Sequence, residues 1–109
     1  MDEVVLLYTT WPDAETAEAA AAEAVEQRLC ACANVLAPMR SIYRWQGKVE
    51  QAEEIPVIFK TTAQAAPELA RRLAARHPYD TPAIAALPVA EGGSHAPFLA
   101  WIGAETGRD

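Results

Sequence analysis

The sequence predicts an α+β fold, a ferredoxin-like sandwich with the element order βαββαβ, a long central hairpin and a C-terminal helix. Short apolar runs rich in β-branched residues alternate with alanine-rich stretches of high helix propensity, in the order strand, helix, strand, strand, helix, strand, helix. The chain has 109 residues and is 51% hydrophobic. This length and composition predict one compact globular domain over 1–109.

The first half of the chain predicts a strand, a helix and a second strand. The run EVVLLYTT over 3–10 is apolar and bounded by turn residues, which indicates a buried strand. Asp13 is placed to cap a helix over 14–31, where alanines fall on one arc. The stretch 32–45 is expected to be a long strand that is bent or interrupted at Pro38.

A hairpin is expected in the middle of the chain. The pair 46–47 is Gln-Gly, and Gly47 can supply the positive φ that a two-residue turn needs. The return strand is expected over 48–62, with a bulge or irregularity at Pro56. Strands of this length reach roughly 45 Å, whereas a compact globule of this size has a radius of gyration of about 13 Å. Part of the hairpin should therefore project and pair with another copy by strand addition.

The second half predicts a helix, a strand and a final helix. The first helix is expected over 63–77, with His77 on its apolar face and Pro78 ending it. The strand is expected over 81–90 and the last helix over 95–105.

Composition predicts a cytoplasmic protein without nucleic-acid or membrane partners. Nine Lys+Arg against fifteen Asp+Glu give a net charge of −6, which disfavours binding to phosphate backbones. No apolar run approaches the roughly 20 residues of a membrane helix, and the opening MDEVVLLYTT does not read as a signal peptide. Cys30 and Cys32 are too few for a disulfide framework and are expected to be packed thiols.

Five strings identify a resemblance to a known family. They are RLCACANV (28–35), SIYRWQGKVE (41–50), KTT (60–62), HPYDTP (77–82) and FLAWI (98–102). In this order and spacing they closely resemble the CutA family of proteins linked to divalent-cation tolerance. The resemblance covers nearly the whole chain. It implies a homotrimer, a cytoplasmic setting, binding of copper or another divalent cation, and no established catalytic reaction. The alternative is a non-catalytic trimeric module similar to the PII signalling proteins, with small-ligand clefts between subunits.

The resemblance also implies a metal position. Some family members are ascribed a copper site made of a first-strand cysteine and two adjacent histidines. Here Tyr8 and Arg76 occupy two of these positions, and Ala83 stands where many members carry a glutamate. Of the three implied ligand positions, only the one at His77 still carries a metal-binding side chain. His77 is therefore the predicted metal residue, and copper is predicted as a non-obligatory cofactor. The other interpretation of His77 is a helix end whose imidazole satisfies last-turn carbonyls.

Six further residues are predicted to line a cleft or a subunit interface. They are Tyr8, Tyr43, Trp45, Lys60, Tyr79 and Trp101. Aromatic residues are enriched in interface cores, and Lys60 at a strand end either binds an anion or is solvated. Glu50 and Glu54 share one strand face and either contact a hard cation or form a solvated acidic edge. The sequence contains no G-x-S-x-G, Walker or H-E-x-x-H motif, so the protein is not expected to be an enzyme.

Overall fold

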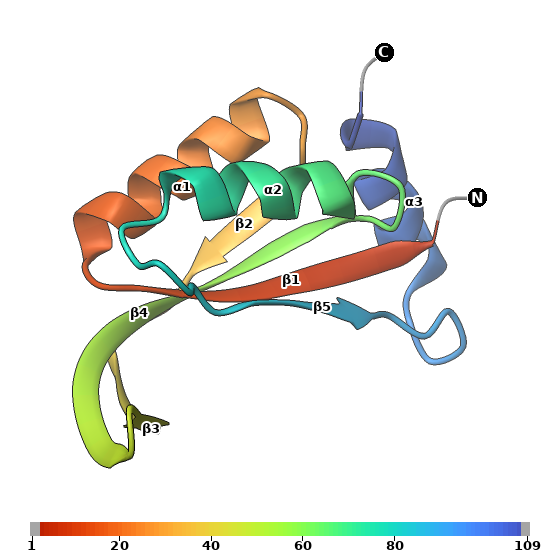
Figure 1. The fold of residues 1–109 in the computed structure, drawn as a ribbon. Coiled ribbons are helices and arrows are strands. Elements are labelled where there is room, and N and C mark those ends of the chain that lie inside the picture. The colour runs from red at the N-terminus through yellow and green to blue at the C-terminus, as the bar shows by residue number, and fades with distance from the viewer. Residues whose placement is uncertain (1–2, 108–109) are drawn as a thin grey trace.

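The computed structural model describes residues 3–107, which form one antiparallel sheet and three helices. The strands are β1 (Val4–Trp11), β2 (Cys32–Val35), β3 (Met39–Trp45), β4 (Lys48–Thr62) and β5 (Ile84–Pro88). The helices are α1 (Ala14–Glu26), α2 (Ala66–Arg76) and α3 (Ala96–Glu105) (Figure 1). The sheet order is β2-β4-β1-β5, and β3 pairs with the first part of β4. The predicted α+β class is confirmed. Within residues 3–107, no helix is long and apolar enough to span a bilayer.

The helices α1 and α2 cover one face of the sheet (Figure 1), and the core lies between them and the strands. Alternation along β1 points Val5, Leu7 and Trp11 toward the helices, and Phe59 of β4 lies opposite Leu7. All four side chains are buried. The alanine face of α1 lets this helix approach the sheet closely, because Ala17, Ala20, Ala21 and Ala24 are its buried residues.

The start of α1 is confirmed, but its end is not. The Asp13 carboxylate accepts a hydrogen bond from the Thr16 amide at 2.8 Å, as expected of an N-cap. The helix ends at Glu26 and does not continue to residue 31, because Arg28 adopts a left-handed conformation with φ of 59°. The Arg28 guanidinium donates to the Gly107 carbonyl at 2.7 Å, which ties this turn to the segment after α3.

The expected strand over 32–45 is broken at 36–38, whereas β4 continues past the break as one curved strand (Figure 1). Val35 pairs with Val57 and Met39 pairs with Glu54, so three residues stand opposite two. The Leu36 amide donates to the Pro56 carbonyl at 2.9 Å. Because the N and C=O of one strand residue point to the same side, the missing N–H of Pro56 faces this break. The expected irregularity near Pro56 is therefore present, and its extra residue lies in the partner segment and not in β4.

The remaining boundaries differ by a few residues. The helix α2 begins at Ala66, because the Ala65 amide donates to the Thr62 hydroxyl at 3.2 Å and the chain turns over 63–65. The strand β5 covers only Ile84–Pro88 of the expected 81–90. The helix α3 lies within one residue of the expected 95–105.

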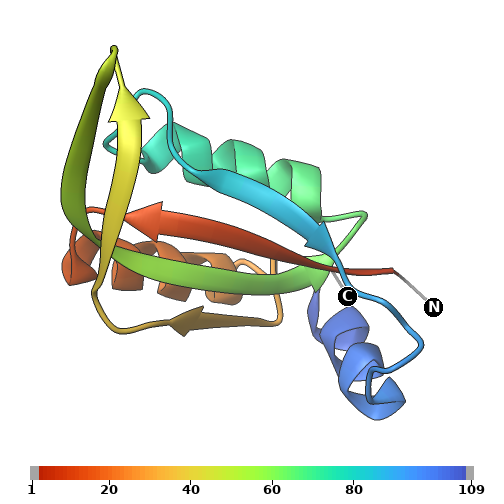
Figure 2. The same cartoon turned by 90° about the horizontal axis from the view of Figure 1, so that it is seen from below.

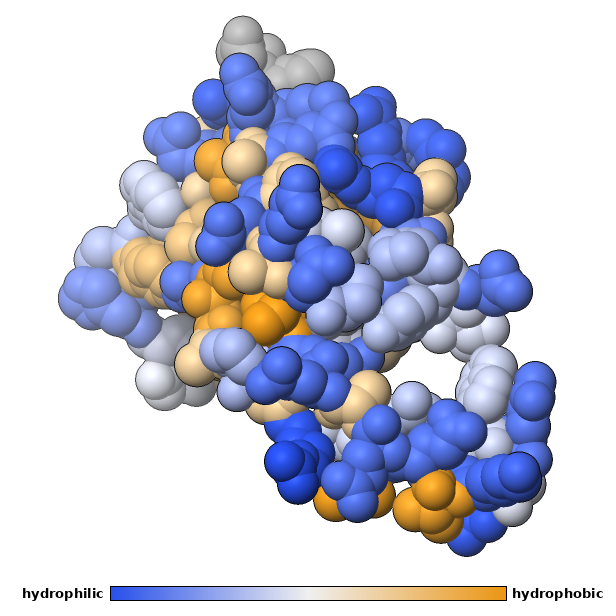
Figure 3. All heavy atoms as spheres, turned by 90° about the vertical axis from the view of Figure 1, so that its left-hand side faces the viewer, coloured by the Kyte–Doolittle hydropathy of each residue, from blue (hydrophilic) through white to orange (hydrophobic). Residues whose placement is uncertain are grey.

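The β3–β4 hairpin projects from the body, as predicted. Gln46 and Gly47 both have positive φ, 51° and 80°, which makes the two-residue turn of a tight hairpin. The molecule is 44 Å long with a radius of gyration of 14.5 Å. Ile42 and Val49 on the hairpin are 66% and 64% exposed. Figure 3 shows the hairpin standing off the body with a hollow between the two.

The second face of the sheet is not covered by α1 or α2. In Figure 2 the strands face the viewer and these two helices lie behind them. Cross-strand pairing places Leu6, Tyr8, Ile58, Lys60, Ala85 and Leu87 on this side, which is called the open face below.

Burial of Cys30 generates a pH prediction. Its side chain is 1% exposed, and burial raises the pKa of the thiol from 9.0 to about 12. The unfolded thiol loses its proton near pH 9 while the folded thiol keeps it. The stability that this thiol contributes is therefore complete below pH 9 and is lost as the pH rises toward 12. We expect the melting temperature of Cys30→Ala to fall less steeply between pH 9 and 11 than that of the unmodified protein, measured by circular dichroism.

Cys32→Ala is the matched control, because Cys32 is only partly buried. Its slope should stay closer to that of the unmodified protein than to that of Cys30→Ala, because burial is the largest cause of the raised Cys30 pKa. Parallel slopes for all three proteins would contradict the assignment of the alkaline loss to Cys30.

Candidate functional site

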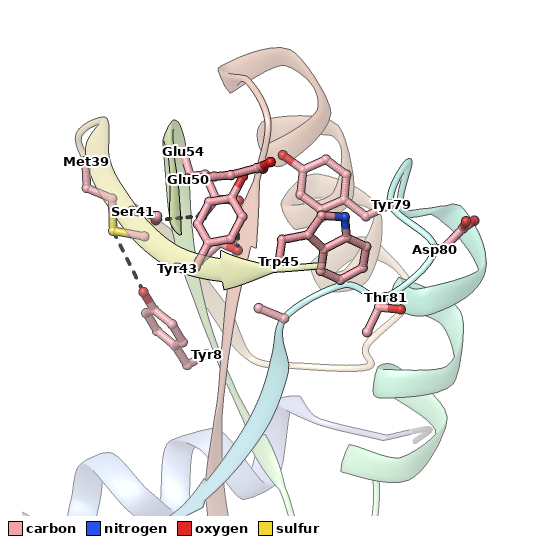
Figure 4. A pocket seen from close by; sticks show the side chains of 12 residues that line it. Tyr8, Met39, Ser41, Tyr43, Trp45, Glu50, Glu54, Tyr79, Asp80 and Thr81 are labelled. Atoms are coloured by element: carbon pink, nitrogen blue, oxygen red, sulfur yellow. Dashed lines mark hydrogen bonds between the residues drawn. The ribbon is translucent and has the colours of Figure 1, made fainter. Parts of the chain in front are cut away.

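A cavity of about 620 Å³ lies between the projecting hairpin and the body. Its lining comes from three separated segments: the end of β1, the two hairpin strands, and the chain over 79–83 after α2 (Figure 4). The hairpin contributes one wall because β3 and β4 bend away from the sheet as a pair.

Strand alternation brings the hairpin residues of this site to one face. Met39, Ser41, Tyr43 and Trp45 alternate along β3 and all line the cavity. On β4, Glu50 lies opposite Tyr43 and Glu54 lies opposite Met39. Both carboxylates therefore point to the same side as the aromatic rings, and the prediction that Glu50 and Glu54 share a face is confirmed.

Glu54 is buried, so the interpretation of a solvated acidic edge was wrong for this residue. It is 9% exposed. Its Oε1 accepts a hydrogen bond from the Ser41 hydroxyl at 2.6 Å, and its Oε2 accepts from the Thr10 hydroxyl at 3.4 Å. A buried carboxylate needs such donors to offset its loss of hydration. Each oxygen still has a lone pair for a further donor.

Tyr79 faces these carboxylates across the cavity. Burial, and next the negative charge of Glu54, raise the pKa of the Tyr79 phenol. Figure 4 shows the phenol pointing toward Glu50 and Glu54. The phenol therefore keeps its proton at neutral pH, and its O–H is a hydrogen-bond donor directed at the Glu54 carboxylate.

His77 is buried below this site and joins two segments of its wall. Its Nε2 lies 2.7 Å from the Thr10 carbonyl oxygen, and its Nδ1 accepts a hydrogen bond from the Tyr79 amide at 3.1 Å. Since a carbonyl only accepts, Nε2 is the donor in this bond, and Nδ1 is the acceptor in the bond from Tyr79. The ring also stacks on Trp11 with 4.3 Å between centroids. The partner of the imidazole is thus a carbonyl of β1 and not the last turn of α2, which corrects that expectation.

The residues at the implied copper position do not fit a preformed copper site. Both ring nitrogens of His77 already hold protein partners. Arg76 forms an ion pair with Glu23, and Tyr8 and Ala83 line the cavity. Across residues 3–107, no cluster of three or more His, Cys, Asp or Glu side chains is arranged to hold a metal ion. Copper would have to displace one of the hydrogen bonds of His77 to bind there.

The six residues predicted to line a cleft or a subunit interface lie in two places. Tyr8, Tyr43, Trp45 and Tyr79 line the cavity. Lys60 and Trp101 lie at α3, where the Lys60 ammonium is 5.3 Å from the centre of the Phe98 ring and Phe98 stacks on Trp101. The Lys60 side chain is therefore only partly exposed and lies over an aromatic ring.

Sequence reasoning missed several lining residues. Met39 and Ser41 follow from Tyr43 and Trp45 by strand alternation, a signal that the sequence does contain. Thr10 gave no such signal, because its place in the cavity depends on the approach of the hairpin to β1.

The contacts of His77 predict a structural cost for its removal. His77→Ala loses two hydrogen bonds and the ring stack on Trp11, and we expect the free energy of unfolding to fall by about 2–4 kcal/mol. The measurement is chemical denaturation followed by circular dichroism. His95→Ala is the control, because His95 is exposed and makes no capping hydrogen bond at the start of α3. This control should change stability by less than about 0.5 kcal/mol. Equal effects of the two substitutions would refute the structural role of His77.

Comparison with known proteins shows similarity along the whole chain. The family described as CutA1 divalent ion tolerance protein matches residues 5–105. The divalent-cation tolerance protein CutA of Thermus thermophilus is 46% identical over 107 residues, which cover 98% of this chain and 100% of that protein.

Solved structures show the same similarity in three dimensions. The Thermus thermophilus protein superposes with a TM-score of 0.88 at 45% identity, covering 98% of this chain and 100% of that one. A protein from Archaeoglobus fulgidus, named a periplasmic divalent cation tolerance protein CutA, superposes with a TM-score of 0.88 at 35% identity, covering 94% and 97%. The chain therefore belongs to the CutA1 family of divalent ion tolerance proteins.

Proposed function

We propose that this protein acts in the cytoplasm as a homotrimer that binds divalent cations, copper among them, in metal tolerance, and that it catalyses no reaction. Its family supports the general role in divalent-cation tolerance. Two free cysteines support a reducing compartment, although the Archaeoglobus fulgidus relative is named periplasmic.

The open face is the observation that carries the proposed assembly. Leu87 on this face is 47% exposed and lies opposite Leu6 of β1, and Tyr8, two residues further along β1, lies opposite Ile58 of β4. Exposed apolar surface of this kind is stabilised when another copy covers it. The hairpin adds exposed aromatic and aliphatic side chains at its tip. We propose the ferredoxin-like class for the protomer, since the order β2-β4-β1-β5 with both α1 and α2 on one face leaves this surface free.

The proposed cation binds at carboxylate oxygens of the acidic surface and not at His77. The net charge of −6 attracts cations. Both nitrogens of the His77 imidazole already form hydrogen bonds, one with the Thr10 carbonyl and one with the Tyr79 amide. Carboxylates bind divalent cations without rearrangement of the core.

Sedimentation equilibrium at micromolar concentration tests the trimer. We expect a mass three times the chain mass of 11.8 kDa. Leu87→Glu places a charge on the open face and should lower this mass toward that of the monomer. Val25→Glu is the matched control, because Val25 is also exposed, at 40%, but lies on α1 on the other side of the molecule. A monomeric unmodified protein, or equal dissociation in both variants, would refute the proposed interface.

Calorimetric titration of chelator-treated protein with Cu²⁺ and Zn²⁺ tests the cation site. We expect His77→Ala to bind as many ions, with the same affinity, as the unmodified protein. Circular dichroism establishes that the variant is folded, and His77→Gln replaces it if it is not. Binding that disappears only in the His77 variants would make the imidazole a ligand and overturn this assignment. No binding to any of the proteins would overturn direct cation binding itself.

A further inference from the structure

We propose that the cavity beneath the hairpin binds a small organic ammonium ion carried on an apolar stem. All of its lining residues come from one chain, and the inference does not rest on the proposed metal binding.

The rings of the cavity supply the first part of the argument. Tyr8, Tyr43, Trp45 and Tyr79 come from three segments and surround one space (Figure 4). The faces of aromatic rings carry negative potential and attract cations, and their carbon surface accepts an apolar stem. Four rings around one cavity therefore favour a ligand that has both features.

The charges of the cavity point the same way. Glu50, Glu54 and Asp80 are among the twelve lining residues, and none of these twelve is Lys, Arg or His. Arg40 and Arg44 alternate to the opposite face of β3, and Lys48 near the tip does not line the cavity. The cavity therefore presents carboxylates without a counter-ion from its own wall.

Glu54 gives the cavity a fixed acceptor. Ser41 and Thr10 donate hydrogen bonds to its carboxylate, and the Tyr79 phenol lies beside it as a third donor. The lone pairs that these three donors leave can accept from N–H groups of a ligand. Burial makes such a hydrogen bond stronger than the same bond at the surface. A primary ammonium group matches this acceptor.

The shape of the lining favours an organic cation over a metal ion. A hard divalent cation needs about six to eight oxygen ligands at short distance, whereas much of this lining consists of rings and the Met39 side chain. A volume of about 620 Å³ falls in the range of small-molecule sites.

The test uses 2-phenylethylammonium as the probe and its neutral analogue 2-phenylethanol as the control ligand. The readout is the indole N–H resonance of Trp45 in the ¹⁵N-labelled full chain, assigned with Trp45→Phe. Trp11 is buried in the core and Trp101 lies on α3, so their resonances are internal references. We expect the ammonium to shift the Trp45 signal saturably, and the alcohol to bind at least about tenfold more weakly.

Charge-neutral variants locate the binding. Glu50→Gln changes an exposed residue of the lining and should weaken binding of the probe by about three- to tenfold. Asp80→Asn should have a smaller effect, because Figure 4 shows the Asp80 carboxylate pointing away from the rings. Glu54→Gln should weaken binding further than Glu50→Gln. Glu53→Gln removes the same charge from an exposed hairpin position outside the cavity and should leave affinity unchanged within about twofold.

Three outcomes would overturn the proposal. Equal affinity for the ammonium and the alcohol would show that the cavity binds the apolar stem only and that its carboxylates do not recognise the charge. Equal weakening by Glu53→Gln and Glu50→Gln would reduce the effect to general surface charge. An unresponsive Trp45 signal in the assembled protein, with a response only on dilution to monomer, would show that a second copy fills the cavity.

Discussion

The whole molecule depends on β4, a single strand that belongs both to the central sheet and to the projecting hairpin. Its second half, from Ile55 to Thr62, lies between β1 and β2 and forms the centre of the sheet, whereas its first half pairs only with β3. The change occurs at Pro56, where β1 ends on one side and β2 gives way to β3 on the other. A strand that continues without a bulge transmits the position of the buried core to the exposed hairpin. Because β4 is continuous, the wall of the cavity is held by the same backbone hydrogen bonds as the sheet.

His77 holds the opposite wall of the cavity in place, as β4 holds the hairpin wall. Its ring joins the carbonyl of Thr10 to the amide of Tyr79 and rests on Trp11. The segment that carries Tyr79 and Asp80 has no regular secondary structure, and the imidazole is what attaches it to β1. A residue that resemblance suggests as a metal ligand is here a buried hydrogen-bond bridge. The same side chain cannot easily serve both purposes, because each nitrogen has one lone pair or one proton to use.

The resulting surface is divided by charge and polarity. The open face is mainly apolar, with Lys60 at its edge next to α3, and the cavity at the hairpin combines aromatic rings with carboxylates. These are different chemistries on neighbouring parts of one side of the sheet. The first suits contact with another copy and the second suits a cationic ligand. Tyr8 belongs to both surfaces, whereas Leu87 belongs only to the open face and Glu50 only to the cavity. Substitutions at Leu87 and Glu50 therefore distinguish assembly from ligand binding.

Local sequence determined the features that depend only on neighbouring residues. The Asp13 cap, the Gln46–Gly47 turn, the apolar alternation of β1 and the shared face of Glu50 and Glu54 follow from spacing and backbone preference, and the structure contains them all. Tertiary structure decided the rest. The end of α1 depends on Arg28 reaching the segment after α3, and the role of His77 depends on Thr10, which is 67 residues away. The cavity exists only because three distant segments meet. Such contacts are chosen by packing of the whole chain, which no local pattern records.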